Sequence, residues 1–380
     1  MDVYIFGAGE RGQLLKNRLE QMGIRILGYI DGSPEKIGKK ISGIPCVSIK
    51  EASVRKRSEL VFISPWNDDG LEEMLTSYFA VVINKKLTDM IIKMSPAMYE
   101  YDDFYPIGHY YSLYPNIDDV VGTVDKTEQG VDESEIISID MNLDVQMGML
   151  KKMQKSYKLI PEWVSIDNTT KSKYRYRIGN LSLSYGDAVG LFSMLSILSP
   201  NKIIEVGSGW TSAIMLDLNE FFWGGTKDIS FVEPYPQTLK KILKTDDNVE
   251  LIEESLQKVP LSYFQSLDEG DVLFIDSTHV SKYGSDVNYL FFEILPRLKK
   301  GVIIHLHDIF YPFEYPHRWI KSGMVWNEDY LLRAFLQYNK EFEIVFFQNY
   351  LEKAHRDIFI ENWPFDDKTI HGGSFWMRKK

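Results

Sequence analysis

The chain has 380 residues, with 43 Lys and Arg against 54 Asp and Glu, and a formal net charge of −11. This length predicts two domains of roughly 100–200 residues each. A content of 44% hydrophobic and 26% charged residues excludes a wholly disordered chain. The acidity argues against a nucleic-acid-binding protein, which needs a basic face to neutralise phosphates.

Features of secreted and membrane proteins are missing from the sequence. No basic stretch precedes the first apolar run, and no run of roughly 18 apolar residues could span a bilayer. The single cysteine, Cys46, has no partner for an internal disulfide and is predicted to be a core residue. We therefore expect a cytoplasmic protein without a membrane span, and the sequence leaves open whether it forms a homo-oligomer.

The first 95 residues alternate between short apolar runs and helical spacing. Strands are expected at residues 2–6, 24–30, 44–48, 60–64 and 80–84, with a helix at 10–22 after the first strand. This βαβ order predicts a parallel sheet. We expect residues 1–95 to form a Rossmann-like domain of the nucleotide- or nucleotide-sugar-binding type.

A complete GxGxxG loop, with Gly7, Gly9 and Gly12, lies between the first strand and the first helix. Such a loop lets the backbone approach a pyrophosphate, and Asp31, 19 residues after Gly12, is placed to bind a ribose hydroxyl. The alternative is a loop kept for packing, with no bound ligand. Residues 1–90 resemble the small N-terminal domains of bacterial sugar O-acyltransferases, which implies nucleotide-sugar binding or regulatory docking.

Residues 96–190 are expected to form a linker and an aromatic and helical cap of the catalytic domain. Residues 96–125 are rich in Tyr, Pro and Asp, and residues 126–160 are polar and then helical. Such a high aromatic density favours a segment that packs on the rest of the protein.

A second alternation begins at Lys202. Strands are expected at 202–206, 228–233, 249–252, 271–276, 301–307, 342–347 and 374–378, and helices at 210–221, 236–244, 286–298 and 330–336. Five βα units followed by two closing strands resemble the seven-stranded sheet of class I methyltransferases, whose last two strands form an antiparallel hairpin. The predicted fold is therefore α/β, with two Rossmann-like domains, the second over residues 191–380.

The loop after the first strand of this domain reads Glu205-Val206-Gly207-Ser208-Gly209, and Glu233 ends the next strand. A carboxylate near the loop suits the cationic amino group and sulfonium of S-adenosylmethionine, and Glu233 is placed to hold both ribose hydroxyls. The alternative is a helix-capping turn beside a surface acid. The loop and Glu233 resemble the first two motifs of class I S-adenosylmethionine-dependent methyltransferases, which implies that Glu205, Gly207, Ser208, Gly209, Glu233 and Asp276 contact this cofactor.

Two polar clusters follow the fourth and fifth strands of the domain: Asp276 with His279, and His307 with Asp308. Ligands bind at the carboxyl ends of parallel strands, and a histidine is a natural base near neutral pH. We therefore predict His279 as the general base for methyl transfer to a hydroxyl. His305 is expected to be structural.

Residues 274–319 resemble a bacterial methyltransferase family associated with surface-glycan biosynthesis. They are more distantly similar to metal-dependent sugar O-methyltransferases of macrolide tailoring. That resemblance implies a divalent metal, Mg²⁺ or Mn²⁺, bound by Asp276 and Asp308, with His307 where those enzymes have a carboxylate. A histidine there either shifts the preference from Mg²⁺ toward Mn²⁺, Fe²⁺ or Zn²⁺ or abolishes the metal. Without metal, Asp308 is expected to orient His279 or His307.

Aromatic loops are the candidate roof of the acceptor pocket. Residues 310–319 and 105–114 carry rings that stack well on sugars, although packed Pro/Tyr loops have the same composition. His317 and Arg318 are candidate ligands for an acceptor phosphate or carboxylate. The motifs at 174–177 and 185–187 are expected either to cover the cofactor or to have a structural role in packing or helix capping.

The sequence therefore predicts a methyltransferase that O-methylates a small-molecule or glycan acceptor, such as a nucleotide sugar. Two alternatives remain open at this point. One is an NAD-dependent sugar-nucleotide-modifying enzyme that uses the Gly7–Gly12 loop, and the other is a non-catalytic scaffold of glycan assembly.

Overall fold

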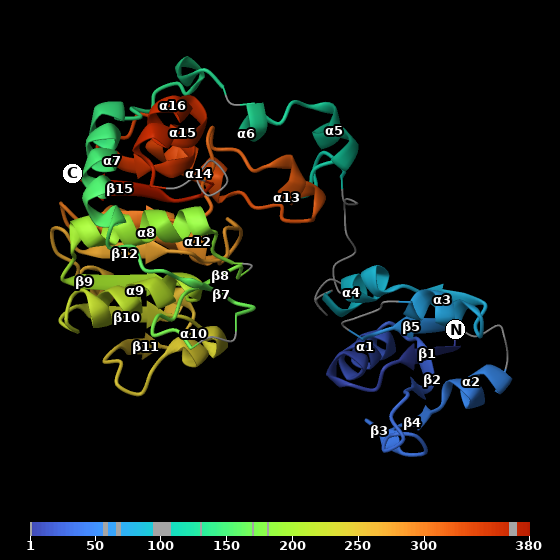
Figure 1. The fold of residues 1–380 in the computed structure, drawn as a ribbon. Coiled ribbons are helices and arrows are strands. Elements are labelled where there is room, and N and C mark those ends of the chain that lie inside the picture. The colour runs from blue at the N-terminus through green and yellow to red at the C-terminus, as the bar shows by residue number, and fades with distance from the viewer. Residues whose placement is uncertain are drawn as a thin grey trace. The chain divides into compact units, whose positions relative to one another are not determined.

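A computed structural model of the chain describes residues 2–55, 60–65, 70–93, 108–129, 131–168, 171–180, 182–364 and 371–380. Contacts between residues divide the chain into two compact units, Met1–Leu113 and Tyr114–Lys380, which are drawn in Figure 1. Among the described residues, no helix combines the length and the apolar character needed to cross a bilayer.

The first unit is a six-stranded sheet with helices on both faces. The strand order is β3-β4-β2-β1-β5-β6, parallel except for the β3–β4 pair. Side chains alternate between the two faces: Val3 and Ile5 pack in one core cluster and Tyr4 in the other. The strands are β1 (Asp2–Phe6), β2 (Arg25–Ile30), β3 (Lys40–Ile41), β4 (Ile44–Val47), β5 (Leu60–Ile63) and β6 (Val81–Ile83), and the helices are α1 (Glu10–Gln21), α2 (Ile49–Arg55), α3 (Leu71–Thr76) and α4 (Lys85–Lys93).

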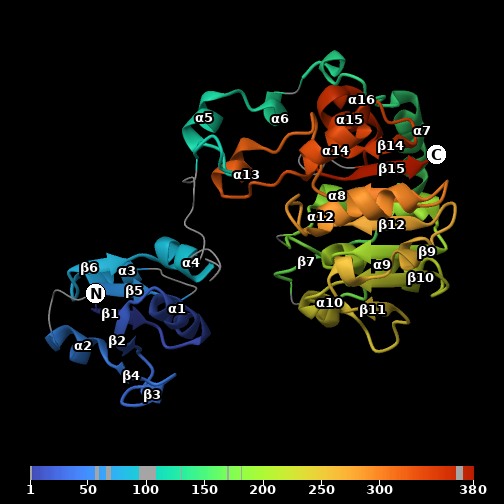
Figure 2. The same cartoon turned by 180° about the vertical axis from the view of Figure 1, so that it is seen from behind.

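The second unit has a seven-stranded sheet with the order β11-β10-β9-β12-β13-β15-β14. All neighbours are parallel except that β15 runs antiparallel to both β13 and β14. Figures 1 and 2 show β14 and β15, in red, at the opposite end of this sheet from β11. The strands of this unit are β7 (Val164–Ser165), β8 (Arg177–Ile178), β9 (Lys202–Val206), β10 (Asp228–Val232), β11 (Glu250–Ile252), β12 (Val272–Ile275), β13 (Ile303–Leu306), β14 (Phe342–Phe347) and β15 (Phe375–Lys379).

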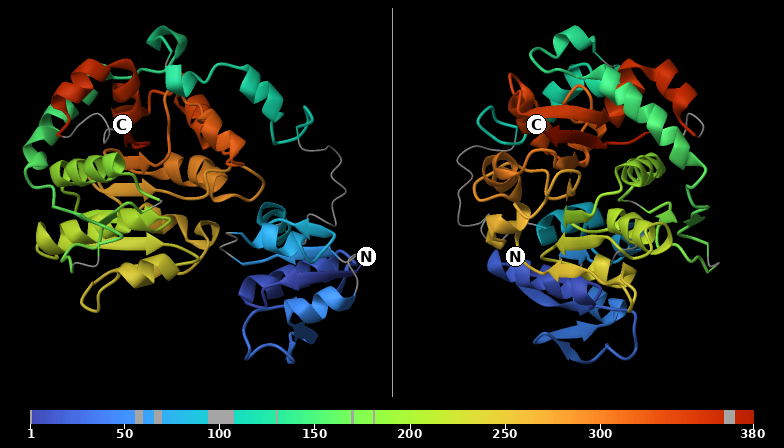
Figure 3. Two further views of the ribbon diagram at one scale, coloured as in Figure 1. Left: turned by 45° about the vertical axis from the view of Figure 1, so that its right-hand side comes forward. Right: turned by 90° about the vertical axis from the view of Figure 1, so that its left-hand side faces the viewer.

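Helices cover both faces of this sheet. In the right-hand view of Figure 3 the green helices lie on one face and the orange segment on the other. The central strands β9, β12 and β13 are mostly apolar and almost entirely buried, as expected for strands covered on both faces. The helices are α5 (Ile117–Gly122), α6 (Lys126–Gln129), α7 (Leu143–Tyr157), α8 (Tyr185–Leu198), α9 (Trp210–Phe221), α10 (Gln237–Ile242), α11 (Leu261–Phe264), α12 (Asp286–Tyr289), α13 (His317–Lys321), α14 (Glu328–Leu336), α15 (Gln348–Ala354) and α16 (Arg356–Asn362), with short helical turns η2 (Glu133–Glu135), η3 (Leu256–Lys258), η4 (Leu290–Ile294) and η5 (Leu295–Arg297).

Several local features differ from the sequence-based expectation, and one is that the helix expected at 286–298 is divided into α12, η4 and η5. The β14–β15 pair is antiparallel as predicted, but α15 and α16 lie in the connection, so the two strands do not form a tight hairpin. The helix expected at 330–336 begins two residues earlier, at Glu328. That earlier start adds an acidic residue, Glu328, to the helix near the strand ends.

Candidate functional site

The glycine loop of the second unit joins β9 to α9 in a very close approach to β12. Gly207 has a φ of +83°, and a Cβ atom at this position would lie 1.7 Å from the carbonyl oxygen of Asp276. Only glycine avoids both the left-handed strain and this collision. Gly209 has a φ of 179°, and a Cβ atom there would meet nothing within 4 Å. The loop therefore has one glycine enforced by the fold and one that faces open space.

Glu205 lies beneath this loop and is fully buried. Its two carboxylate oxygens accept hydrogen bonds from the hydroxyls of Thr211 and Ser212 in the first turn of α9, the second at 2.8 Å. Burial raises the pKa of Glu205 to about 8, against the lowering effect of these two hydroxyls. The structure thus places this predicted cofactor residue as a support for the start of α9.

Glu233 lies at the end of β10 and binds the loop itself. Its Oε2 accepts the N–H of Ser208 at 3.0 Å, and its Oε1 accepts the N–H of Tyr235 at 2.7 Å. A cavity of about 420 Å³ opens beside it. The cavity is lined by Val206, Gly207, Val232, Glu233, Pro234, Tyr235, Ser255, Leu256, Gln257, Asp276, Ser277, Thr278, Lys282, Gly284, Ser285 and Asp286.

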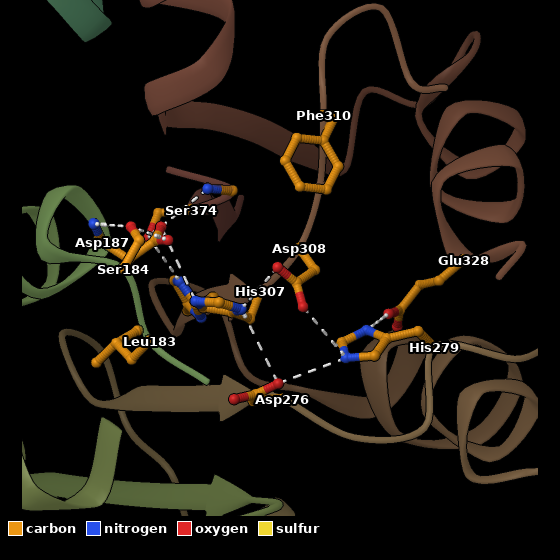
Figure 4. A network of polar contacts seen from close by, with 12 residues as sticks. Leu183, Ser184, Asp187, Asp276, His279, His307, Asp308, Phe310, Glu328 and Ser374 are labelled. Atoms are coloured by element: carbon orange, nitrogen blue, oxygen red, sulfur yellow. Dashed lines mark hydrogen bonds and ion pairs between the residues drawn. The ribbon is translucent and has the colours of Figure 1, made fainter. Parts of the chain in front are cut away.

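The two polar clusters predicted at the strand ends lie together, as Figure 4 shows. Asp276 follows β12, and His279 Nε2 is 3.5 Å from its Oδ1 and 3.8 Å from Oδ2 of Asp308. His307 follows β13, and its Nδ1 is 3.3 Å from Oδ1 of Asp308 and 4.0 Å from Oδ1 of Asp276. Both histidines are buried, whereas the two aspartates are partly exposed.

Two buried acids complete the site, and sequence reasoning did not predict either role. Oε2 of Glu328, at the start of α14, lies 2.9 Å from Nδ1 of His279. Asp187, at the start of α8, lies on the other side of His307, with its Oδ1 3.9 Å from Nε2 of that ring (Figure 4). Asp187 also accepts the N–H of Gly373 at 2.8 Å. The sequence predicts either capping or covering of the cofactor for the motif at 185–187, and no motif or spacing indicates Glu328.

The surrounding carboxylates dominate the electrostatics of the two histidines. Burial lowers the pKa of His279, but hydrogen bonds to Asp276 and Glu328 and the charge of Asp308 raise it well above its usual value. Burial likewise opposes ionisation of His307, while Asp308, Asp276 and Asp187 raise its pKa to about 10. For Asp276, burial raises the pKa, and the two histidines lower it to about 2. The cluster is therefore an array of opposite charges held in a low-dielectric environment.

Three of these side chains present a donor set that fits a metal ion. One atom each of Asp276, His279 and Asp308 lie within 4.8 Å of one another. One imidazole nitrogen and two carboxylate oxygens suit Mn²⁺, Fe²⁺ or Zn²⁺ better than Mg²⁺, which prefers oxygen alone. In this group His279 takes the place that the sequence-based set gave to His307. Neither ring nitrogen of His307 has a hydrogen-bond partner among the described residues.

His305 lies in the core. Its ring is fully buried and stacks on Phe274, with centroids 3.9 Å apart and planes within 6°. Burial lowers its pKa well below the usual value, which keeps the ring neutral. These contacts favour the structural role that we expected for it.

The neighbouring motifs have identifiable contacts. Arg175 is buried and forms ion pairs with Asp217, Glu220 and Asp247. Because Asp217 and Glu220 belong to α9, these pairs hold the segment around residues 174–177 against that helix. The backbone N–H of His317 donates to Asp125 at 2.9 Å, while Arg318 is largely exposed. Residues 96–107 of the predicted linker and aromatic segment lie outside the described residues.

The glycine loop of the first unit is built in the same way as that of the second. Gly7 has a φ of +95°, and a Cβ on Gly12 would lie 2.0 Å from the carbonyl oxygen of Gly7. A Cβ on Gly9 would meet nothing within 4 Å. Asp31 accepts the N–H of Ala8 at 2.9 Å, as Glu233 accepts that of Ser208. The four predicted residues therefore lie at one loop.

Comparison with known proteins finds a family that the second unit resembles. Residues 204–309 match the model of a family described as "Methyltransferase domain". An uncharacterised protein of Archaeoglobus fulgidus is 29% identical over 197 residues, which are 52% of this chain and 88% of that protein. Residues 204–309 thus resemble a methyltransferase domain, and the order of the seven-stranded sheet around them fits the class I fold.

Two solved structures resemble the chain at a lower level. Methyltransferase FkbM from Methylobacillus flagellatus is 13% identical with a TM-score of 0.36, over 90% of this chain and 85% of that one. The plantazolicin methyltransferase BpumL, solved with a triazolic desmethylPZN analogue and SAH, is 12% identical with a TM-score of 0.32, over 63% of this chain and 100% of that one. At these TM-scores no detail of either structure transfers to this chain.

Proposed function

We propose that the protein transfers a methyl group from S-adenosylmethionine to a hydroxyl of a sugar or glycan precursor, with His279 as the general base. The observation that carries the proposal is that Asp276 lies both at the cavity and beside His279. This residue lines the cavity beside Gly207 and Glu233, and its carboxylate lies 3.5 Å from Nε2 of His279. A methyl donor in the cavity and a base at the strand ends would then be neighbours, as methyl transfer requires.

The residues in and around the cavity would have different roles in cofactor binding. Glu233 would hold the ribose, since its carboxylate keeps acceptor capacity beyond the bonds from Ser208 and Tyr235. The open face of Gly209 leaves room for the cofactor beside the backbone. Glu205 would act indirectly, because its bonds to Thr211 and Ser212 fix the first turn of α9.

A base must be neutral when the acceptor hydroxyl arrives. In the chain alone, carboxylates around His279 favour the charged imidazole. The sulfonium of S-adenosylmethionine, or a divalent ion, would bring positive charge beside Asp276 and offset these carboxylates. Binding of the methyl donor would thereby favour the form of His279 that accepts a proton.

A metal ion would be held by Asp276 and Asp308, and it would supply charge stabilisation for the developing alkoxide. Nε2 of His279 cannot bind that ion and accept the proton at once, so we assign it to the proton. His307 would then support the site through its charge, between Asp187 and the two aspartates.

Aromatic rings near His279 favour a sugar-like acceptor. Trp326 stacks on the ring of His279, and Trp319 lies edge-on to Trp326 with centroids 5.1 Å apart. Both tryptophans are only partly buried, which leaves ring surface for an acceptor. We also propose that the first unit binds a nucleotide or nucleotide sugar at its glycine loop.

The proposal is tested by calorimetric titration of the purified protein with S-adenosylhomocysteine, with and without EDTA, and then with NAD. We expect micromolar binding of S-adenosylhomocysteine, loss of that binding in Glu233→Ala, and retention in His279→Ala. Transfer of tritiated methyl from S-adenosylmethionine to a panel of nucleotide sugars should fall to a small residual rate in His279→Ala. Binding of NAD without S-adenosylhomocysteine would place the chemistry in the first unit and refute the proposal, whereas cofactor binding without any turnover would favour a scaffold.

A further inference from the structure

We infer that the start of α14 positions the ring of His279, and that Glu328 is the positioning residue that makes Nε2 the proton-accepting atom. The inference rests on the proposed role of His279 in methyl transfer. Trp326, Asn327 and Glu328 form what we call the histidine clamp. Three consecutive residues of one segment thereby contact a histidine that precedes them by almost fifty positions.

The clamp holds the ring of His279 on one face and one edge. Trp326 stacks on the face, with centroids 4.3 Å apart and planes inclined by 29°. Oε2 of Glu328 lies 2.9 Å from Nδ1, and the side chain of Glu328 is 1% exposed. With this edge fixed, the opposite edge places Nε2 3.5 Å from Asp276 and 3.8 Å from Asp308.

The clamp also holds the backbone of His279 in a conformation that a histidine rarely adopts. Its φ is +58°, in the left-handed region. The carbonyl oxygen of His279 accepts the N–H groups of Asn327 at 3.1 Å and Glu328 at 3.2 Å. The side chain of Asn327 further accepts the N–H of Ser281 at 2.6 Å and donates to its carbonyl at 3.1 Å. Strained backbone held by several bonds is typical of a positioned functional residue.

The chemistry of the pair defines what Glu328 would contribute. A carboxylate at Nδ1 accepts a hydrogen bond from the N–H of that nitrogen, which leaves the lone pair of the neutral ring on Nε2. During transfer the acceptor oxygen forms the bond to the methyl carbon, the carbon–sulfur bond breaks, and its electron pair returns to sulfur. The hydroxyl proton moves to Nε2, and the buried charge of Glu328 stabilises the imidazolium that results.

The first test needs no acceptor. In full-length protein with ¹⁵N-labelled histidine, we expect a slowly exchanging Nδ1–H signal that disappears in His279→Ala. The signal should be lost in Glu328→Ala and shifted in Glu328→Gln, whose neutral oxygen still accepts the bond. The matched control is Glu352→Gln, because Glu352 is also fully buried and bonded to a histidine, His371. That control should leave the signal of His279 in place.

An unshifted signal in both variants of Glu328, or in the Gln variant if the Ala variant does not fold, would overturn the inference.

The second test is a double-mutant cycle on methyl transfer to the nucleotide sugar that gives turnover. Glu328→Gln should lower kcat about 10- to 100-fold in the wild type, with unchanged affinity for S-adenosylhomocysteine, and should lower it no further in His279→Ala. Equal losses in both backgrounds would indicate a merely structural role. If the wild type shows no methyl transfer at all, the proposed function fails, and the nitrogen signal alone still decides whether Glu328 holds the N–H group at Nδ1.

Discussion

Replacement of Gly207 by alanine gives the most direct test of the loop geometry. The new Cβ would lie 1.7 Å from the carbonyl oxygen of Asp276, at a residue with a φ of +83°. Left-handed backbone costs an alanine about 1–2 kcal/mol. A forced shift in a packed region adds about 1–3 kcal/mol. We therefore expect Gly207→Ala to lower the free energy of unfolding of the second unit by about 2–5 kcal/mol.

Gly209→Ala is the matched control, two residues further along the same loop. Its backbone is extended, with a φ of 179°, and its Cβ would enter open space. We expect a change in unfolding free energy of less than about 1 kcal/mol, but weaker binding of S-adenosylhomocysteine, because the methyl group would occupy cofactor space. Urea denaturation and calorimetric titration measure the two effects. The reasoning is refuted if Gly207→Ala is as stable as the wild type and binds S-adenosylhomocysteine equally well.

Three further substitutions test separate parts of the site. Glu233→Gln should keep the fold and lower the affinity for S-adenosylhomocysteine about 10- to 100-fold, as loss of charge-assisted hydrogen bonds predicts; calorimetry showing an unchanged affinity would contradict this. Burial raises the pKa of Glu205 to about 8, so the stability of the wild type should fall as pH rises from about 4.5 to 8. Glu205→Gln removes this pH dependence. The stability of the variant relative to the wild type should therefore be higher at about pH 9 than at about pH 6. Denaturation that shows the same difference at both pH values would be inconsistent with a buried neutral acid. Gly373→Ala would put a Cβ 2.8 Å from Cα of Asp308, so methyl transfer should fall while S-adenosylhomocysteine binding persists, and unaltered turnover would refute the role of Asp308.

Periodicity in the sequence predicted the sheet of the second unit well, because its central strands are short apolar runs between glycine or charged residues. β9, β14 and α9 have the bounds that the sequence predicted. The connection between β14 and β15 was not predicted, because α15 and α16 bury polar residues such as Glu352 against tertiary partners. A pattern of apolar residues carries no information about such pairs.

The candidate site was predictable to the extent that strand ends define it. Asp276, His279, His307 and Asp308 follow two neighbouring parallel strands, so the topology alone brings them together. Glu328 follows His279 by almost fifty residues and reaches it through the packing of α14, for which the sequence offers no spacing rule. Glu205 illustrates the reverse case. Its type and position agree with a cofactor contact, and the structure adds a role that the sequence did not predict: its carboxylate accepts hydrogen bonds from the hydroxyls of Thr211 and Ser212 and supports the start of α9.

The paired glycine loops of the two units lead to a last prediction, which concerns Asp31. Its carboxylate accepts the N–H groups of Ala8 and Ser33 and lies 3.1 Å from Nζ of Lys36. Burial raises the pKa of Asp31, but these hydrogen bonds lower it to about 2. A lowered pKa means stability that is present above the unfolded value near 4 and is lost as pH falls toward 2, worth about 2 kcal/mol at neutral pH.

Asp31→Asn should therefore destabilise the first unit by about 2 kcal/mol at pH 7, and the difference should shrink as pH falls below 4. Hydrogen exchange of peptides from β1 and β2 measures the stability of this unit separately from that of the second unit. If the difference in stability between Asp31→Asn and the wild type stays constant down to pH 2, the hydrogen bonds of Asp31 stabilise the unit without its charge.

Since Glu233 accepts the equivalent bond from Ser208, the loop geometry explains an acid at this strand end before any ligand is considered. Nucleotide binding by the first unit therefore has to be tested by titration with a nucleotide sugar, where a Kd that is unchanged in Asp31→Asn would exclude the ribose contact.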